Sequence, residues 1–156
     1  MLYNVVMKIR NAEIKDLKAV QELNNQLFEL ELANFDKNLI KGWSFSNEGK
    51  AYFENAIKNS LVIVAEIDDI IVGYLLAEEI QIPYYSFKIA ELCNMCVDEN
   101  YRKQGIGRAL YENFEIYYKS KNIDKFMVIA SFKNESAKNF YKKMGFVETN
   151  STFAKF

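Results

Sequence analysis

The chain has 156 residues, a length that fits one domain, 1–156, and leaves little room for a second. Half of its residues are hydrophobic and 26% are charged, which excludes an intrinsically disordered chain. The 20 basic and 21 acidic residues give a formal net charge of -1, which argues against a dedicated nucleic-acid binder.

The predicted secondary structure alternates between strands and helices along the chain. A strand over residues 5–10 precedes helical spacing of apolar residues over 13–34 and again over 47–60. Strands over 61–67 and 70–80 flank Asp68-Asp69, which predicts a hairpin. The remaining elements are a strand over 88–97, a helix over 105–121, a strand over 125–132, a helix over 134–144 and a strand from 146 to the end. The helices between the later strands predict a mixed α/β sheet.

Two residue types limit the chemistry and the location of the protein. There is no histidine, which excludes a Ser-His-Asp triad, a Cys-His pair and a His-ligated metal, so we expect no metal cofactor. With only two cysteines, we expect no disulfide framework, and this low number favours a reducing compartment. There is no run of 18 apolar residues, and residues 1–10 lack the features of a signal peptide. We therefore expect a soluble cytoplasmic protein without membrane contact.

The segment 91–110 carries the clearest chemical signal. A strand leads into Arg102-Lys103-Gln104-Gly105-Ile106-Gly107, and an amphipathic helix follows. The glycines allow the backbone to approach a ligand, and the helix start offers unpaired N–H groups with a partial positive charge. With Arg108 nearby, this arrangement predicts a phosphate or pyrophosphate site. The spacing fits neither a Walker loop nor a dinucleotide fingerprint. The simpler alternative is a helix entry whose glycines serve only a tight turn.

Three motifs in order resemble those of the GNAT superfamily of N-acetyltransferases. Arg102-x-x-Gly105-x-Gly107 after Met95-Cys96-Val97 resembles its acetyl-CoA motif. Asn134-x-x-Ala137-x-x-Phe140-Tyr141-x-x-Met144-Gly145-Phe146 resembles its second conserved block, and Ile9-Arg10-Asn11-Ala12 with Asp16-Leu17 resembles its opening. The resemblance implies an α/β fold with a mixed, bent central sheet flanked by helices, and acetyl-CoA in a splay between two parallel strands.

The resemblance also implies roles for individual residues. Residues 102–108 would hold the CoA pyrophosphate, and the strand segment Met95, Cys96 and Val97 would offer backbone groups to the pantetheine and the acetyl carbonyl. Asn134 would hydrogen-bond the pantetheine arm. Tyr141 would protonate the leaving thiolate, and Glu91 stands where the histone-acetylating branch carries its general base. Lys103-Gln104 departs from the family pattern, which often has a glycine here.

The chemistry of amine acetylation gives these roles a physical reason. Deprotonating a lysine-like amine with a pKa near 10.4 costs roughly 4.6 kcal/mol at pH 7. A general base that removes this proton would therefore assist the reaction. Without histidine, Glu91 is the best-placed candidate, directly or through water. The simpler alternatives are a solvated Glu91, a core aromatic at Tyr141 and an Asn134 that serves only as a helix N-cap.

The acceptor and the partners are less well defined by the sequence. Acidic residues in 22–36 and interleaved aromatics suit a cationic acceptor, such as a polyamine, an aminoglycoside or a basic peptide; the simpler alternative is a solvated helix face with core aromatics. Cys93-x-x-Cys96 lies within a strand, where positions three apart face opposite sides, so redox and zinc roles are not expected. The apolar end 153–156 is compatible with a homodimer.

We expect an N-acetyltransferase that moves an acetyl group directly from acetyl-CoA to a primary amine. Two alternatives remain open: a non-catalytic acyl-CoA sensor on the same fold, and a different nucleotide-phosphate binder.

Overall fold

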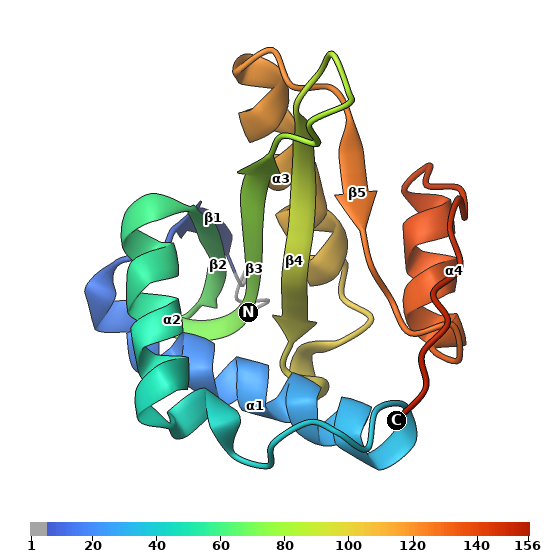
Figure 1. Ribbon diagram of the computed structural model, residues 1–156. Coiled ribbons are helices and arrows are strands. Elements are labelled where there is room, and N and C mark those ends of the chain that lie inside the picture. The colour runs from blue at the N-terminus through green and yellow to red at the C-terminus, as the bar shows by residue number, and fades with distance from the viewer. Residues whose placement is uncertain (1–5) are drawn as a thin grey trace.

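Five strands form one mixed sheet in the computed structural model, which describes residues 6–156 (Figure 1). The strands follow their sequence order across the sheet; neighbours from β1 to β4 are antiparallel, and β5 is parallel to β4. The strands are β1 (Met7–Asn11), β2 (Leu61–Ile67), β3 (Ile70–Ile80), β4 (Ile89–Val97) and β5 (Phe126–Val128). The helices are α1 (Leu17–Asn34), α2 (Asn47–Asn59), α3 (Ile106–Ser120) and α4 (Glu135–Lys143), with 3-10 turns η1 (Ile14–Asp16), η2 (Trp43–Phe45) and η3 (Glu99–Tyr101).

The β2–β3 hairpin has the predicted bounds. Asp68 and Asp69 both adopt positive φ angles, 49° and 62°, as a two-residue type I′ turn requires. Asp is one of the few non-glycine residues that tolerates this region. The turn therefore fixes the register in which β2 and β3 bury their apolar residues.

Helices cover the two faces of the sheet and bury a separate apolar cluster on each (Figure 1). On one face α3 packs on the sheet through Ile106, Leu110 and Phe114. On the other face α1 and α2 contribute Val20, Leu23, Phe53 and Ala56. The arrangement confirms the expected mixed sheet flanked by helices.

A β-bulge in β4 decides which side chains reach which face. Leu76 pairs with Asn94 while Ala77 pairs with Leu92, so Cys93 is the extra residue. The extra residue reverses the alternation of the strand. Leu92 before the bulge and Met95 after it therefore belong to the α3 cluster.

Two predicted elements differ from the structure near the C-terminus. The strand predicted over 125–132 is only Phe126–Val128, and no strand forms over 146–156. The exposed fractions of Val147, Phe153 and Phe156 are 77%, 94% and 100%, so these side chains bury nothing against the sheet. A strand needs a partner to satisfy its backbone groups, and β5 leaves the sheet too early to provide one. The prediction of a final strand was therefore wrong.

The N-terminal elements shift slightly from their predicted bounds. The first strand is Met7–Asn11, and residue 5 of the predicted strand lies outside the described residues. The predicted helix over 13–34 divides into η1 and α1, which meet at Asp16. Among the described residues, no helix combines the length and the apolar character needed to cross a bilayer.

Candidate active site

The parallel strands β4 and β5 separate after a short paired segment (Figure 1). Their pairing ends at Leu92 with Val128, although β4 continues to Val97. Ala90 N–H donates to Lys125 across the β5 edge, whereas Asp98 N–H donates to Val72 of β3. Because N–H directions alternate along a strand and the bulge reverses the alternation once, Met95 and Val97 turn their N–H groups to the β5 side. No strand in the described chain pairs with them there.

Cys96, predicted with Met95 and Val97, is placed differently. Its side chain is buried in the cluster under α1 and α2. By the same alternation its backbone faces β3. Of the three predicted residues, Met95 and Val97 therefore line the opening between the strands, and Cys96 does not.

The start of α3 lies beside the carboxyl end of β4 and keeps its N–H groups free. No side chain caps this helix end, and its first backbone bond runs from Ala109 N–H to Gly105 O. The N–H groups of Ile106, Gly107 and Arg108 have no partner within residues 6–156. Ile106 is 2% exposed and anchors the helix in the core. Free donors at a helix N-terminus form an anion site.

The loop that precedes α3 needs two left-handed residues. Lys103 has a φ of 61° and Gly105 a φ of 81°. Lys103 stands where the family pattern often has glycine, so it carries strain of roughly 1–2 kcal/mol. A Cβ on Gly107 would meet Phe140 and Val97 only at 3.6–3.8 Å, which is ordinary contact. The protein itself leaves room for a side chain at Gly107.

The basic and polar residues of the loop are exposed. Arg102 turns back and donates from Nε to the Val97 carbonyl at 3.0 Å, which ties the loop to the end of β4. Arg108 pairs with Glu112 at 2.9 Å on the helix surface. Lys103 and Gln104 are exposed. None of the four side chains is buried.

α4 brings the second motif to the same opening. Asn134 caps the helix, its Oδ1 accepting from Ala137 N–H at 3.1 Å, so its NH2 group remains for another partner. Tyr141 packs against Phe140 and Phe146. Burial, aided by the Glu31 carboxylate, raises the pKa of Tyr141 to about 12. Its hydroxyl makes no hydrogen bond to another described residue, and with the raised pKa it stays protonated at neutral pH.

Glu91 lies on the opposite face of β4 from the α3 core. It pairs with Glu78 of β3, so two carboxylates stand side by side on the sheet, a repulsive arrangement. Glu78 accepts from the Ser60 hydroxyl at 3.2 Å. At about 3.3 Å per residue, Glu91 lies roughly 13 Å along β4 from Met95. Phe140, the neighbour of Tyr141 in α4, lies beside Gly107, whereas Glu91 lies further along β4.

The two cysteines face the same side of β4, contrary to the prediction that they face opposite sides. Cys96 is buried in the α1–α2 cluster and Cys93 packs against it, because the bulge at Cys93 reverses the alternation between them. Burial raises the pKa of Cys93 to about 12 and that of Cys96 to about 11. Both thiols stay protonated at neutral pH, which is the opposite of a reactive thiolate.

The predicted acidic and aromatic wall is partly core. Phe28 stacks on Trp43 with ring centroids 5.6 Å apart, and Trp43 also contacts Phe53, so these aromatics build the cluster under α1 and α2. Glu31 is half-buried, and burial together with the neighbouring Asp36 raises its pKa.

Three residues beside Glu91 escaped the sequence analysis. Asn94 is an uncharged polar residue in a largely apolar strand, and this pattern in the sequence could have marked it as a candidate site residue. Tyr52 and Glu78 lie on other elements, α2 and β3, and only the fold brings them near Cys93 and Glu91. Burial and these neighbours raise the pKa of Tyr52, and the nearby Asn94 side chain opposes the rise.

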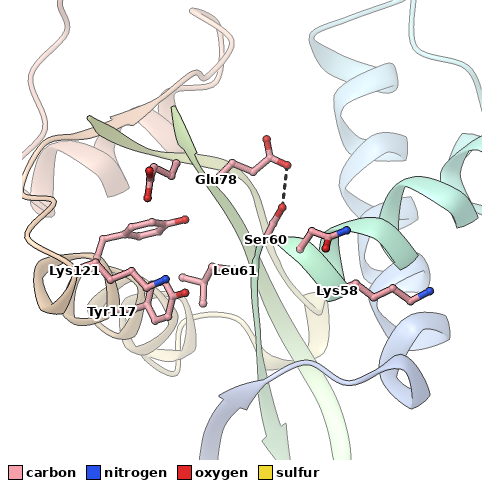
Figure 2. A pocket seen from close by; sticks show the side chains of 9 residues that line it. Lys58, Ser60, Leu61, Glu78, Tyr117 and Lys121 are labelled. Atoms are coloured by element: carbon pink, nitrogen blue, oxygen red, sulfur yellow. Dashed lines mark hydrogen bonds between the residues drawn. The ribbon is translucent and has the colours of Figure 1, made fainter. Parts of the chain in front are cut away.

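A cavity of about 420 Å³ lies at the other end of the sheet from the loop 102–108. Figure 2 shows Lys58, Ser60, Glu78, Tyr117 and Lys121 around it, with the Ser60–Glu78 hydrogen bond. At its rim Glu79 pairs with Lys88, and the Lys121 ammonium lies over the Tyr117 ring. It contains none of the predicted site residues.

A sheet that opens between two parallel strands, beside a free helix N-terminus, defines a fold that can hold an extended phosphate-bearing ligand. The family model described as acetyltransferase (GNAT) domain matches residues 58–148. The chain therefore belongs to the GNAT family and is an acetyl-CoA-dependent acyltransferase. The family resemblance inferred from the three motifs is confirmed. No curated protein sequence matches the chain significantly.

Solved structures of similar fold cover nearly the whole chain. A tetramutant of the BH1408 protein from Bacillus halodurans is 27% identical, with a TM-score of 0.79 over 95% of this chain and 98% of that one. A predicted acetyltransferase from Clostridium acetobutylicum, solved with acetyl-CoA, is 22% identical, with a TM-score of 0.78 over 97% and 96%. The aminoglycoside N-acetyltransferase AAC(6')-Iy in complex with CoA is 16% identical, with a TM-score of 0.80 over 100% and 97%.

Proposed function

We propose that this chain transfers the acetyl group of acetyl-CoA directly to a primary amine of a small cationic molecule. The opening between β4 and β5, bordered by the uncapped start of α3, carries the proposal. The structurally similar AAC(6')-Iy is an aminoglycoside N-acetyltransferase, which supports a small-molecule amine as the acceptor class. We further propose that the protein acts in the cytoplasm and that residues 1–156 form one domain. A homodimer is compatible with this proposal. A peptide amine is the alternative acceptor.

The pyrophosphate site is the first part of the proposal. The free N–H groups of residues 106–108, with Arg102, Lys103 and Arg108, would hold the pyrophosphate, each charge-assisted bond contributing roughly 1.5–3 kcal/mol. Gln104 and Gly105 complete this loop. The backbone at Met95 and Val97 would bind the pantetheine arm and the acetyl carbonyl, and the NH2 group of Asn134 would bind the same arm.

Proton transfer is the second part. The neutral amine nitrogen attacks the thioester carbon, the C–N bond forms and the C–S bond breaks. Glu91 would take the proton of the amine, through water given its distance from Met95. Tyr141 would protonate the leaving CoA sulfur, since its hydroxyl is protonated at neutral pH and makes no hydrogen bond within the described chain. Direct transfer fits the two protonated cysteines, which are poor nucleophiles.

Calorimetric titration with acetyl-CoA tests the proposal without any guess about the acceptor, with ATP as the control. We expect micromolar binding of acetyl-CoA and none of ATP. CoA release would then be measured with a polyamine, an aminoglycoside and a basic peptide. Binding without release for any amine would favour the non-catalytic sensor, and equal binding of ATP would favour a general nucleotide-phosphate site.

A further inference from the structure

A chain of buried hydrogen bonds runs from the loop before α2 to the bulge of β4. Ser44 Oγ lies 2.6 Å from Asn24 Oδ1, Asn24 Nδ2 lies 2.9 Å from Tyr74 Oη, and Tyr74 Oη lies 2.5 Å from Asn94 Oδ1. Ser44 and Tyr74 are fully buried and Asn24 is 1% exposed. Asn94, at the end of the chain, is half-buried. The proposed reaction uses none of the four side chains.

The chain of bonds has a direction. The Ser44 hydroxyl makes no other side-chain hydrogen bond among the described residues, so its proton must go to Asn24 Oδ1. Asn24 therefore presents its NH2 group to Tyr74. Tyr74 Oη accepts that hydrogen bond. Its own single proton is therefore donated to Asn94 Oδ1. The two short separations suit O–H donors and the longer one an N–H donor.

This direction determines which end of the Asn94 amide turns toward the face of β4 that carries Glu91 and Cys93. Its oxygen is held by Tyr74 inside the protein, so its NH2 group points away, toward the partly exposed face that carries Glu91 and Cys93. Hydrogen bonding from Asn94 opposes the burial-induced rise in the pKa of Tyr52, which is consistent with an NH2 group turned to that side. A flip of the Asn94 amide would turn its NH2 group toward Tyr74 Oη, so the proton of the Tyr74 hydroxyl would lose its acceptor.

We propose that Asn94 is a specificity-determining residue whose NH2 group donates a hydrogen bond to an oxygen of the acceptor. The inference rests on the proposed function, because it describes the acceptor of that reaction. Glu78 and Glu91 lie on the same face and suit the ammonium form of the amine. An NH2 group repels an ammonium but binds a hydroxyl or ether oxygen. The acceptor class is therefore an amine with an oxygen on a neighbouring carbon, as opposed to a plain alkylamine.

A matched pair of probes tests this inference: trans-2-methoxycyclohexylamine and cyclohexylamine, which differ by one ether group whose oxygen can only accept a hydrogen bond. CoA release would give kcat/KM for both amines. We expect the wild type to prefer the amino ether about fivefold to tenfold, the value of one neutral hydrogen bond. Equal values for the two amines would overturn the inference, and so would no release with either amine.

Two variants separate specificity from folding. Asn94→Asp keeps an oxygen for Tyr74 but replaces the NH2 donor by an acceptor, so the preference should reverse toward cyclohexylamine. Asn113→Asp adds the same charge on the exposed face of α3 and should leave the preference unchanged. A preference that survives Asn94→Asp would overturn the inference. Titration with acetyl-CoA identifies failure of the proposed function, since then neither the wild type nor the variants would bind it.

Discussion

Gly107 shows how one residue can separate folding from binding. A Cβ at this position has room in the protein, and alanine is the better helix residue by up to about 1 kcal/mol. We therefore expect Gly107→Ala to keep or slightly raise the free energy of unfolding. If the backbone here touches the pyrophosphate, the added methyl group should weaken acetyl-CoA binding at least tenfold. Thermal unfolding and calorimetry measure the two effects.

Gly105→Ala is the matched control two positions earlier. With a φ of 81°, it should lose about 1–2 kcal/mol of stability from backbone strain, although its Cβ would meet nothing within 4 Å. Unchanged acetyl-CoA affinity in Gly107→Ala would show that the glycine serves only the helix entry.

Tyr141 carries a second prediction at the scale of one residue. Tyr141→Phe removes only the hydroxyl, so the packing against Phe140 and Phe146 should persist. Loss of a general acid lowers kcat by roughly 100-fold or more. Acetyl-CoA affinity should change less than threefold. A kcat close to that of the wild type would return Tyr141 to a purely structural role.

At the scale of elements, one arginine holds three of them together. Arg10 of β1 lies 2.7 Å from Asp16 at the start of α1 and 2.6 Å from Glu66 of β2, and all three side chains are largely buried. Arg10→Met should lower the free energy of unfolding by about 2–3 kcal/mol, because it leaves two carboxylates unpaired. Urea denaturation measures this loss.

Lys15→Met is the control for this ion pair. Lys15 and its partner Glu13 are 66% and 60% exposed, and such surface pairs contribute less than about 1 kcal/mol. Equal losses in the two variants would mean that the buried position of Arg10 contributes nothing.

At the scale of the whole molecule, the pH dependence of stability should be flat near neutrality and fall at both extremes. Hydrogen bonds from Arg10 lower the pKa of Asp16, so its contribution is present above pH 4 and is lost as the pH falls through the lowered value. Burial raises the pKa of Cys96 to about 11 and those of Cys93 and Tyr141 to about 12. Their contributions are complete below pH 9 and are lost as the pH rises toward these values.

Chemical denaturation from pH 3 to pH 11 measures this profile. Without histidine, no side chain of ordinary pKa titrates between pH 5 and 8, so the midpoint should stay constant there. A marked change in that interval would mean that a carboxylate or thiol titrates far from the values expected here.

The motifs of this chain could be recognised from sequence because each depends on local chemistry. Gly105 and Gly107 mark a helix entry, Asn134 a helix cap, and Asp68-Asp69 a two-residue turn, all of which involve neighbouring residues. The order of helices and strands up to residue 144 was predicted from local signals of this kind, and the three motifs carried the resemblance to the family. The same reasoning failed at 146–156, where apolar residues predicted a strand but no partner strand was available.

By itself, the sequence determined the alternation of strands and helices and the candidate anion-binding loop, since local spacing encodes both. Its three motifs also carried the resemblance to the family. Only the tertiary structure decided which residues share a face of β4. One extra residue at Cys93 turns Met95 and Val97 toward the opening and places Asn94 beside Glu91. The direction of the Ser44–Asn24–Tyr74–Asn94 chain likewise depends on burial, because a proton must find an acceptor only where water is excluded.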